Sequence, residues 1–280
     1  MTLGITGATG ALGRLVARAL SERGLDQRLL VRDPSRAPEL AGASVATTSS
    51  ADGELARASL ADVTTLFMVS GAEAADRLDQ HRSFIDAAAD AGVDHVVYTS
   101  FLGAAPDATF TLARDHWATE EHLRASGMAF TFLRDSFYLD FLPDLVGDDG
   151  VIRGPAADGR VAAVTRADIA RSAVAVLTDP RANAGRTWDL TGPEALTLTE
   201  VAAILAEHSG RLVRYHDESV EEAYASRRRW PAPQWQYDAW VSTYTAIAAG
   251  ELAVVTDHVA QLTGREPTGL ASYLSTKEHR

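Results

Sequence analysis

No cysteine occurs among the 280 residues of the sequence. Its absence excludes a disulfide framework, thiol catalysis and metal centres held by cysteine. Long apolar runs are also missing, so no segment is predicted to cross a bilayer. An apolar, strand-like segment begins within a few residues of Met1 and leaves no room for a signal peptide, so we expect a cytoplasmic protein.

Basic residues are outnumbered by acidic ones, 26 Lys and Arg against 38 Asp and Glu, which gives a formal net charge of −12. A protein of this sign repels the phosphate backbone unless its cations are concentrated in one patch. The one basic run, Arg227-Arg228-Arg229, lies among Glu218, Glu221 and Glu222 and is typical of a solvated helix face. We therefore expect no nucleic-acid partner and no membrane association.

Short apolar segments alternate with helical patterns through the first half of the chain, which is typical of a parallel sheet with helices on both faces. Six strands are expected, at residues 3–6, 28–31, 44–47, 65–69, 95–100 and 129–134. This order predicts an α/β protein with a doubly wound parallel sheet, the Rossmann fold, over residues 1–135. Residues 160–190 are expected to return to that domain. Residues 136–280 are expected to form a smaller, mainly helical lobe that binds the substrate.

Three glycines, Gly7, Gly10 and Gly13, follow the first expected strand at intervals of three residues. Apolar residues at helical spacing come next, so the strand is expected to turn sharply into a helix. Glycine lets the backbone approach a pyrophosphate, whose charge meets the free N–H groups at the helix start. The alternative is a purely structural turn. The coenzyme contacts predicted here are Thr6, Gly7, Ala8, Thr9, Gly10, Ala11, Leu12 and Gly13.

The residue after the second expected strand lies about 20 residues past the glycine turn, where a dinucleotide fold meets the adenosine ribose. An acid there selects NAD, whereas an arginine suits the 2′-phosphate of NADP. Arg32 occupies this place, and Arg36 is expected to add a second contact; the alternative is that Arg32 is a surface charge. Asp33 complicates the choice, because an inward turn of its side chain would bring it to a ribose hydroxyl. We predict NADPH as the coenzyme and favour NADH less.

Several segments of the chain carry a family resemblance. They are residues 6–13, Val31-Arg32-Asp33-Pro34, Tyr98-Thr99-Ser100, His116-Trp117-Ala118-Thr119-Glu120, residues 126–134 and Thr165-Arg166-Ala167-Asp168-Ile169-Ala170. Taken together, they resemble the NmrA-like atypical short-chain dehydrogenase/reductases. Within that family the chain is most similar to the branch of NADPH-dependent quinone oxidoreductases and triphenylmethane reductases. The resemblance continues to residues 262–268 and so covers nearly the whole chain.

The resemblance also has consequences for acid catalysis. Typical members of the wider superfamily protonate the substrate oxygen with a tyrosine, aided by a lysine four residues later on the same helix. Leu112 and His116 occupy those two places, so this dyad is absent. Tyr273 and Lys277 match the spacing but follow the last expected element of the smaller lobe. Resemblance to the reductase branch places His116 near the nicotinamide ribose, and the alternative is a histidine at a helix N-terminus that bonds local backbone groups.

Residues at the carboxyl ends of the expected strands complete the predicted coenzyme site, because ligand chemistry gathers there in this fold. Hydroxyl groups at strand ends also serve as caps of the next segment, which is the structural alternative. The further coenzyme contacts predicted are Ser70, Gly71, Thr99, Ser100, His116, Ser136 and Phe137.

The acceptor side is predicted from aromatic residues. Asp135 follows the sixth strand and departs from the asparagine that is usual in the branch. An aromatic-rich stretch at residues 230–244 is typical of a core, although a flat apolar substrate would also favour such rings. The predicted substrate pocket comprises Phe101, Phe137, Tyr138, Trp235 and Tyr237, and the predicted catalytic residues are His116 and Tyr138. No metal site is predicted, because His95, His116 and His122 lack a ligand spacing with carboxylates.

These features together predict an enzyme that transfers hydride from NADPH to a quinone-like or otherwise conjugated small molecule. Such acceptors take hydride readily, so the missing tyrosine costs little, whereas reduction of a simple ketone would slow by about a hundredfold or more. The alternative is a non-catalytic protein of the NmrA type that binds NAD(P) and acts as a redox sensor. Either protein is expected to be a monomer or a homodimer.

Overall fold

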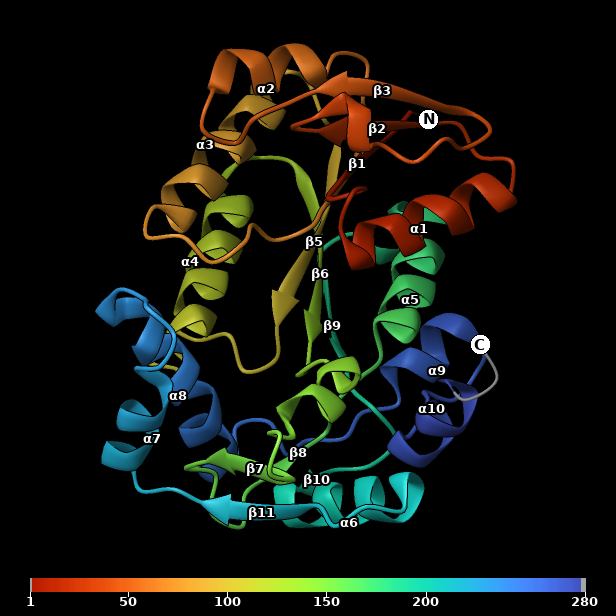
Figure 1. Cartoon of the computed structure of the whole chain (residues 1–280). Coiled ribbons are helices and arrows are strands. Elements are labelled where there is room, and N and C mark those ends of the chain that lie inside the picture. Colours follow the sequence, from red (N-terminus) through yellow and green to blue (C-terminus); the bar gives the residue numbers. More distant parts are fainter. Residues whose placement is uncertain (1, 278–280) are drawn as a thin grey trace. The chain divides into compact units, whose positions relative to one another are not determined.

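The computed structural model describes residues 2–277 (Figure 1). The chain divides into two compact units, and each is discontinuous in sequence. Unit 1 comprises Met1–Ser100, Asp115–Arg134 and Arg166–Trp188, and unit 2 comprises Phe101–Arg114, Asp135–Thr165 and Asp189–Arg280. The domain bounds expected from the sequence, residues 1–135 with a return of residues 160–190 and a lobe at residues 136–280, stay a prediction. The assignment of substrate binding to unit 2 stays a prediction.

Unit 1 is built on a seven-stranded sheet with the strand order β3-β2-β1-β4-β5-β6-β9. The registers from β3 through β5 are parallel. The strands are β1 (Leu3–Thr6), β2 (Gln27–Val31), β3 (Ala43–Thr47), β4 (Thr65–Met68), β5 (His95–Phe101), β6 (Ala129–Asp135) and β9 (Arg186–Leu190). The six expected strands and the Rossmann-type fold are confirmed. The seventh strand, β9, was missed because only its last residue is buried and its sequence lacks an apolar run.

Helices cover both faces of the sheet in unit 1, with α2, α3 and α4 on one side and α1 and α5 on the other (Figure 1). Side chains of α2, α3 and α4 and of β4, β5 and β6 form one continuous core, which includes Leu66, Phe84, Tyr98, Leu123 and Phe132. The helices are α1 (Ala11–Glu22), α2 (Gly53–Ser59), α3 (Arg77–Asp90), α4 (Thr111–Ala125) and α5 (Arg166–Thr178), with 3-10 turns η1 (Pro34–Arg36) and η4 (Arg181–Asn183).

The order of the strands reverses beside β1, which pairs with β2 on one edge and with β4 on the other. In doubly wound sheets the segments that leave the strands at such a switch point diverge, and ligands bind at the carboxyl ends of the strands there. The glycine turn follows β1 directly and lies at this switch point. The fold thus places the predicted coenzyme site where doubly wound sheets bind nucleotides.

Unit 2 is mainly helical and carries two small sheets, β11-β7 and β10-β8. Thr197 and Glu200 form a capping box at the start of α6, and Ser219 and Glu222 form a second one before α7. Of the described helices, none is long and apolar enough to cross a membrane. The elements are η2 (Leu139–Phe141), η3 (Pro143–Leu145), β7 (Val151–Gly154), β8 (Arg160–Val161), β10 (Leu196–Thr197), α6 (Leu198–Ser209), β11 (Arg214–Asp217), α7 (Val220–Arg227), α8 (Gln234–Ala248), α9 (His258–Thr263) and α10 (Leu270–Lys277).

A buried carboxylate joins α4 to the sheet of unit 1. Glu120 is completely buried, and its two oxygens accept hydrogen bonds from Arg134 on β6 at 2.8 and 2.7 Å. Ser100, at the end of β5, donates to the same carboxylate at 2.6 Å, and Arg124 completes the cluster. A buried charge of this kind is stable only while its partners remain in place.

Replacement of Glu120 tests this dependence. We expect Glu120→Gln to lower the free energy of unfolding by about 3 kcal/mol, because it leaves the Arg134 guanidinium without its carboxylate. Glu121→Gln is the matched control, since Glu121 is 47% exposed and pairs with Arg124 alone. That variant should lose less than about 1 kcal/mol. Equal losses in urea unfolding of the two variants would contradict the role given to Glu120.

Candidate functional site

The glycine turn between β1 and α1 has the geometry of an anion cradle. Gly7 adopts a left-handed backbone, with φ +65°, and its carbonyl accepts a hydrogen bond from the Gly10 N–H at 2.8 Å. A Cβ on Gly13 would lie 2.3 Å from that carbonyl oxygen, so no side chain fits. Gly10 caps α1 without a side-chain acceptor, and the first turn of the helix contains no acidic residue. The N–H groups of this turn therefore remain for a phosphate.

Side chains in the same segment serve the fold. The Thr6 hydroxyl accepts a hydrogen bond from Val69 N at 2.8 Å and donates to the Phe67 carbonyl at 3.2 Å, so it joins β1 to β4. Ala8 and Leu12 are buried. Contacts of these three residues to a coenzyme, which stay a prediction, therefore involve the backbone.

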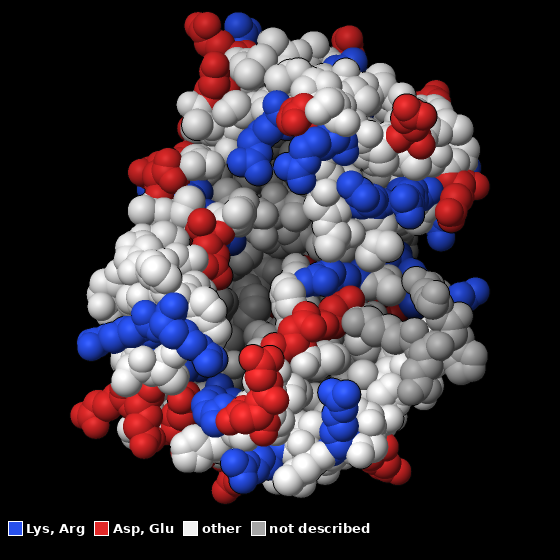
Figure 2. Space-filling model, viewed as in Figure 1, with Lys and Arg blue, Asp and Glu red and all other residues white. Residues whose placement is uncertain are grey.

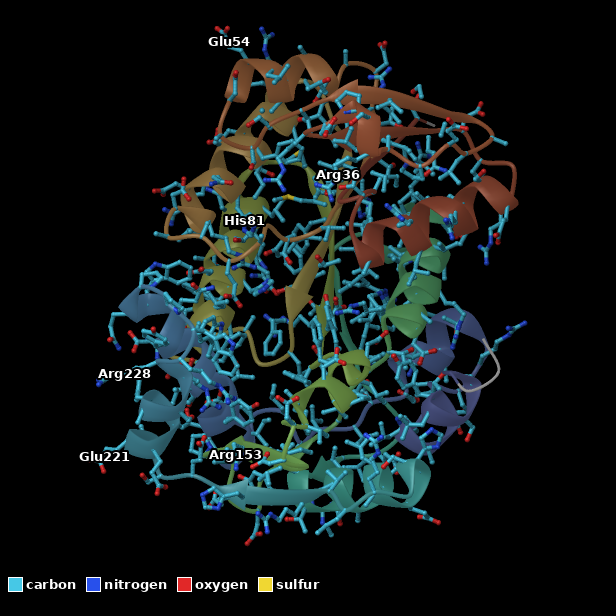
Figure 3. All side chains as sticks on the ribbon, in the orientation of Figure 1. Arg36, Glu54, His81, Arg153, Glu221 and Arg228 are labelled. Carbon is cyan, nitrogen blue, oxygen red and sulfur yellow. The ribbon has the colours of Figure 1, made fainter. Side chains whose placement is uncertain are left out.

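In the segment after β2, two arginine side chains are exposed to solvent, and the aspartate between them forms hydrogen bonds within the segment. Arg32 and Arg36 are exposed, and neither forms a hydrogen bond or ion pair with a residue in the 2–277 range. Asp33 instead accepts hydrogen bonds from the Ser35 hydroxyl at 2.7 Å and the Ser35 N–H at 3.0 Å, which cap η1. Both bonds lower the pKa of Asp33, and the bond from the Ser35 hydroxyl has the larger effect. Figure 2 shows basic side chains gathered on this face of unit 1, and Figure 3 labels Arg36 there.

The loop after β4 is fixed by hydrogen bonds to its backbone. The Ser70 N–H donates to the Thr99 hydroxyl at 2.8 Å, and the Gly71 N–H donates to His81 Nε2 at 2.8 Å. Arg77 Nε donates to the Gly71 carbonyl at 3.0 Å. The structure thus brings together three predicted contacts, Ser70, Gly71 and Thr99, at adjacent strand ends. Their role toward a coenzyme stays a prediction.

His116 lies in the interior of α4 and is buried, so it is not the helix-end residue considered as an alternative. Its Nε2 lies 3.0 Å from Arg77 Nη2, and its Nδ1 lies 2.9 Å from the Tyr98 hydroxyl. Because a guanidinium only donates, Nε2 is an acceptor and the ring is neutral. Burial, and then the Arg77 charge, lower the pKa of His116 well below its usual value. A bond from this ring to a ribose stays a prediction and requires one of these contacts to break.

Sequence reasoning missed the residues that surround His116. Arg77, His81 and Tyr98 are each at most 4% exposed, and they connect α3, β5 and α4. Burial, and then Arg77, lower the pKa of His81 to about 3, and burial raises the pKa of Tyr98. The one signal in the sequence is that these polar residues lie at positions where the helical or strand pattern expects apolar ones. Ser100, also predicted as a coenzyme contact, uses its hydroxyl on Glu120.

In unit 2, the segment after β6 gathers aromatic rings. Phe101 and Phe137 pack against the same apolar core. Tyr138 stacks on Phe141 with ring centroids 5.9 Å apart, and Phe101 packs on Phe110 at 4.8 Å. Three predicted pocket residues, Phe101, Phe137 and Tyr138, therefore belong to one region of unit 2.

The other two predicted pocket residues lie on α8 and make no described ring contact with that region. Tyr237 bonds the backbone of the preceding loop, through the Trp230 carbonyl at 2.8 Å and the Ala232 N–H at 3.2 Å. Its ring meets Trp240, and Trp230, which is 49% exposed, packs on the same tryptophan. The stretch is thus a partly exposed aromatic cluster rather than a buried core. The pocket role of Trp235 and Tyr237 stays a prediction.

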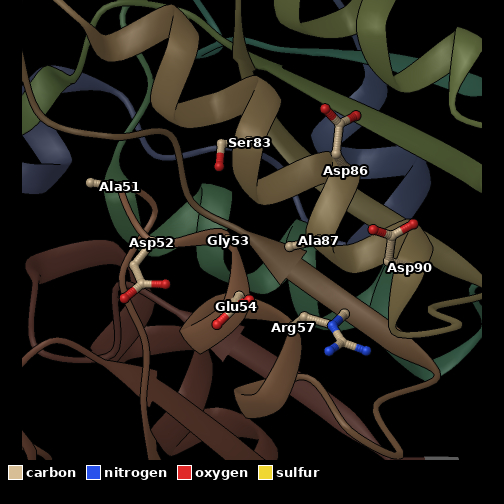
Figure 4. A pocket seen from close by; sticks show the side chains of 9 residues that line it. All are labelled: Ala51, Asp52, Gly53, Glu54, Arg57, Ser83, Asp86, Ala87 and Asp90. Atoms are coloured by element: carbon tan, nitrogen blue, oxygen red, sulfur yellow. The ribbon is translucent and has the colours of Figure 1, made fainter.

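A surface hollow between α2 and α3 lies in a different part of unit 1 (Figure 4). Four carboxylates and one guanidinium, that of Arg57, line it, and this charge repels an anionic nucleotide. Two of the acids have local partners, since Asp52 caps α2 and Asp86 contacts His122. The lining residues are Ala51, Asp52, Gly53, Glu54, Arg57, Ser83, Asp86, Ala87 and Asp90. No group of three or more His, Cys, Asp or Glu in the described residues is arranged to hold a metal ion.

The doubly wound sheet agrees with the comparison to known proteins. The profile of the NmrA-like family matches residues 1–231. The chain belongs to the NmrA-like family. Quinone oxidoreductase 2 of Escherichia coli is 33% identical over 280 residues, which cover 98% of this chain and 97% of the relative. The NAD(P)H azoreductase of Xenophilus azovorans is 33% identical over 277 residues, covering 96% and 95%.

Solved structures of NmrA-like reductases match the fold over the whole chain. The NADPH complex of the E. coli quinone oxidoreductase superimposes with a TM-score of 0.90 at 31% identity and covers 99% of this chain and 100% of that one. The NADP(H) complex of Citrobacter sp. triphenylmethane reductase gives 0.88 at 30% identity, covering 98% and 99%. The predicted family is confirmed. The predicted reductase is favoured over the non-catalytic regulator.

The buried histidines make stability depend on pH. Unfolded histidine binds a proton below pH ~6.5, whereas folded His81 does so only near pH 3, so the free energy of unfolding falls as the pH falls through this window. From pH 7 to pH 5 we expect His81 to remove about 2 kcal/mol. His81→Gln, which keeps an acceptor for Gly71 N, should flatten this dependence in urea unfolding. An unchanged slope in the variant would contradict the burial of a neutral ring.

Proposed function

We propose that the chain is an NADPH-dependent reductase that transfers hydride to a quinone-like or otherwise conjugated small molecule. The observation that carries the proposal is the pairing of an open glycine cradle with two unpaired arginines beyond β2. The cradle accepts a pyrophosphate, and arginine binds a 2′-phosphate through two hydrogen bonds. Asp33 is engaged by Ser35, so it does not compete for the ribose as an NAD-selective acid does.

The chain's own residues determine what the bound coenzyme does. NADPH supplies the hydride, so the protein must hold the coenzyme, orient the acceptor and exclude water. The backbone of residues 7–13 and the side chains of Arg32 and Arg36 hold the anionic groups. The loop at Ser70 and Gly71 is fixed by Thr99 and His81, which gives the coenzyme a rigid boundary.

The acceptor class follows from the missing acid and from the rings of unit 2. Leu112 has no proton to give, and the neutral His116 ring is engaged by Arg77 and Tyr98. A conjugated acceptor spreads the charge left by hydride and tolerates this loss better than a simple ketone. The names of the relatives, quinone oxidoreductase and azoreductase, agree with this class. Phe101, Phe137 and Tyr138 offer flat apolar contacts for such a molecule.

A cytoplasmic location and a monomeric or homodimeric state remain proposals from the sequence. The net charge of −12 supports the proposal that the protein binds no nucleic acid.

The coenzyme preference is tested at Arg32. We expect Arg32→Ala to raise the Kd of NADPH by about tenfold to a hundredfold, because a charge-assisted hydrogen bond to phosphate is lost. The Kd of NADH should change by less than about threefold, since NADH lacks that phosphate. Nicotinamide fluorescence measures both affinities. Arg57→Ala removes an equal charge from the acidic hollow and is the matched control. Equal losses for the two coenzymes in Arg32→Ala would refute the 2′-phosphate assignment.

The acceptor class is tested by turnover. Purified protein with excess NADPH should reduce quinones and cationic triarylmethane dyes, and it should reduce simple ketones at least about a hundredfold more slowly. Oxidation of NADPH, followed by its absorbance across a panel of acceptors, measures these rates. Rapid reduction of simple ketones with no turnover of quinones or dyes would overturn the proposed function.

A further inference from the structure

A carboxyl group is buried at the carboxyl end of β6. Asp135 is the last residue of that strand and is 1% exposed. Its carbonyl accepts a hydrogen bond from Leu102 N at 2.9 Å, and the next residue donates its N–H to the Leu190 carbonyl at 3.0 Å. The backbone is therefore held on both sides of this residue, at the end of the strand where the fold places ligand chemistry.

The carboxyl group of Asp135 has little to compensate its burial. Its Oδ1 atom has no hydrogen-bond partner in the described chain, and neither has the adjacent buried Ser136 hydroxyl. Its Oδ2 atom lies 3.4 Å from the Tyr138 hydroxyl. No arginine or lysine within residues 2–277 forms an ion pair with it. An isolated carboxylate in such surroundings takes up a proton rather than remain charged.

Burial accordingly raises the pKa of Asp135 well above its usual value, and the bond to Tyr138 opposes this shift only in part. A raised pKa keeps the proton on the carboxyl group to higher pH, and a protonated carboxyl group is a hydrogen-bond donor. Its partner along the chain is the Tyr138 phenol, whose ring is held by stacking on Phe141. When the Asp135 carboxyl group donates its hydrogen to the Tyr138 oxygen, the phenol hydrogen points away from Asp135. The phenol then donates this hydrogen to a different acceptor.

We propose that Asp135 and Tyr138 form a proton-donor pair that protonates the oxygen of a quinone or conjugated carbonyl acceptor. This proposal rests on the proposed function and deepens it. The acceptor gains the hydride and one proton, and NADPH is oxidised to NADP⁺. The proton leaves Tyr138 Oη as the acceptor oxygen takes it, the Asp135 carboxyl proton passes to Tyr138 Oη, and water returns a proton to Asp135. The pair thus supplies one proton from the end of β6, whereas Leu112 and His116, at the places of the absent tyrosine and lysine, supply none.

Two acceptors separate proton donation from hydride transfer in the same enzyme. A quinone such as menadione requires both a hydride and a proton. A cationic triarylmethane dye such as malachite green takes hydride alone and becomes neutral. A proton donor is therefore needed for the first acceptor and not for the second, whereas a residue that only shapes the site affects both.

Tyr138→Phe and Asp135→Asn test the pair. We expect each variant to lower kcat for menadione by at least about tenfold, less than the usual general-acid effect of about a hundredfold or more because a conjugated acceptor spreads the charge. Turnover of malachite green should fall by a smaller factor than turnover of menadione, because the dye takes hydride without a proton. The Kd of NADPH should change by less than about threefold. In D₂O, the slowing of menadione reduction seen in the parent should shrink in Asp135→Asn. Tyr224→Phe is the matched control, because the Tyr224 hydroxyl also donates to a carboxylate, Asp238 Oδ1 at 2.8 Å, near the surface.

A direct observation of the proton separates this proposal from the proposed function. Infrared difference spectra of the parent against Asp135→Asn should contain the carbonyl band of a protonated carboxyl group, whether or not an acceptor is present. Absence of that band overturns the pair, as do equal losses for both acceptors or unchanged menadione turnover in both variants. A parent protein that reduces neither acceptor overturns the proposed function and the catalytic role of the pair, even if the band is present.

Discussion

The contact between Gly13 and the Gly7 carbonyl is the constraint on which the coenzyme site depends. Any side chain at Gly13 would push α1 away from the turn, since its Cβ would fall 2.3 Å from the carbonyl oxygen. This close approach holds the start of α1 against the turn, so the N–H groups of its first turn follow directly after the end of β1. Thr6 adds to the same arrangement by joining β1 to β4.

Buried polar groups hold the strand ends around this turn. Glu120 joins Ser100 and Arg134, and His81, Arg77 and His116 connect the loop after β4 to Tyr98. Each group is satisfied by several partners, which is the condition under which a polar network in a low-dielectric interior is stable. Asp135 and Ser136 depart from this condition, since Asp135 Oδ1 and the Ser136 hydroxyl have no hydrogen-bond partner among the described residues. Departures from the rule of satisfied burial concentrate at functional positions.

The family was predicted by resemblance, whereas local patterns in the sequence were sufficient to predict the first six strands, β1 to β6, and the turn at Gly7. Those features depend on alternation, glycine spacing and helical periodicity, which lie within short windows. The network around His116 was not predictable, because Arg77, Tyr98 and His116 come together only when three elements pack. β9 was missed because an exposed edge strand needs no apolar run. The direction of the Asp33 side chain, which bonds Ser35, could not be read from the sequence. Of the residues predicted for the acceptor, Phe101 and Phe137 share one apolar core of unit 2, whereas the ring contact described for Tyr237 is with Trp240.

The loop at Ser70 and Gly71 has a thermodynamic consequence for ligand association. Three of its backbone groups are already bonded to Thr99, His81 and Arg77 before any nucleotide arrives. A segment that is ordered in advance loses little conformational entropy when a molecule settles against it. Contacts between a ligand and this loop therefore contribute to affinity and are not offset by the entropy cost of ordering the loop.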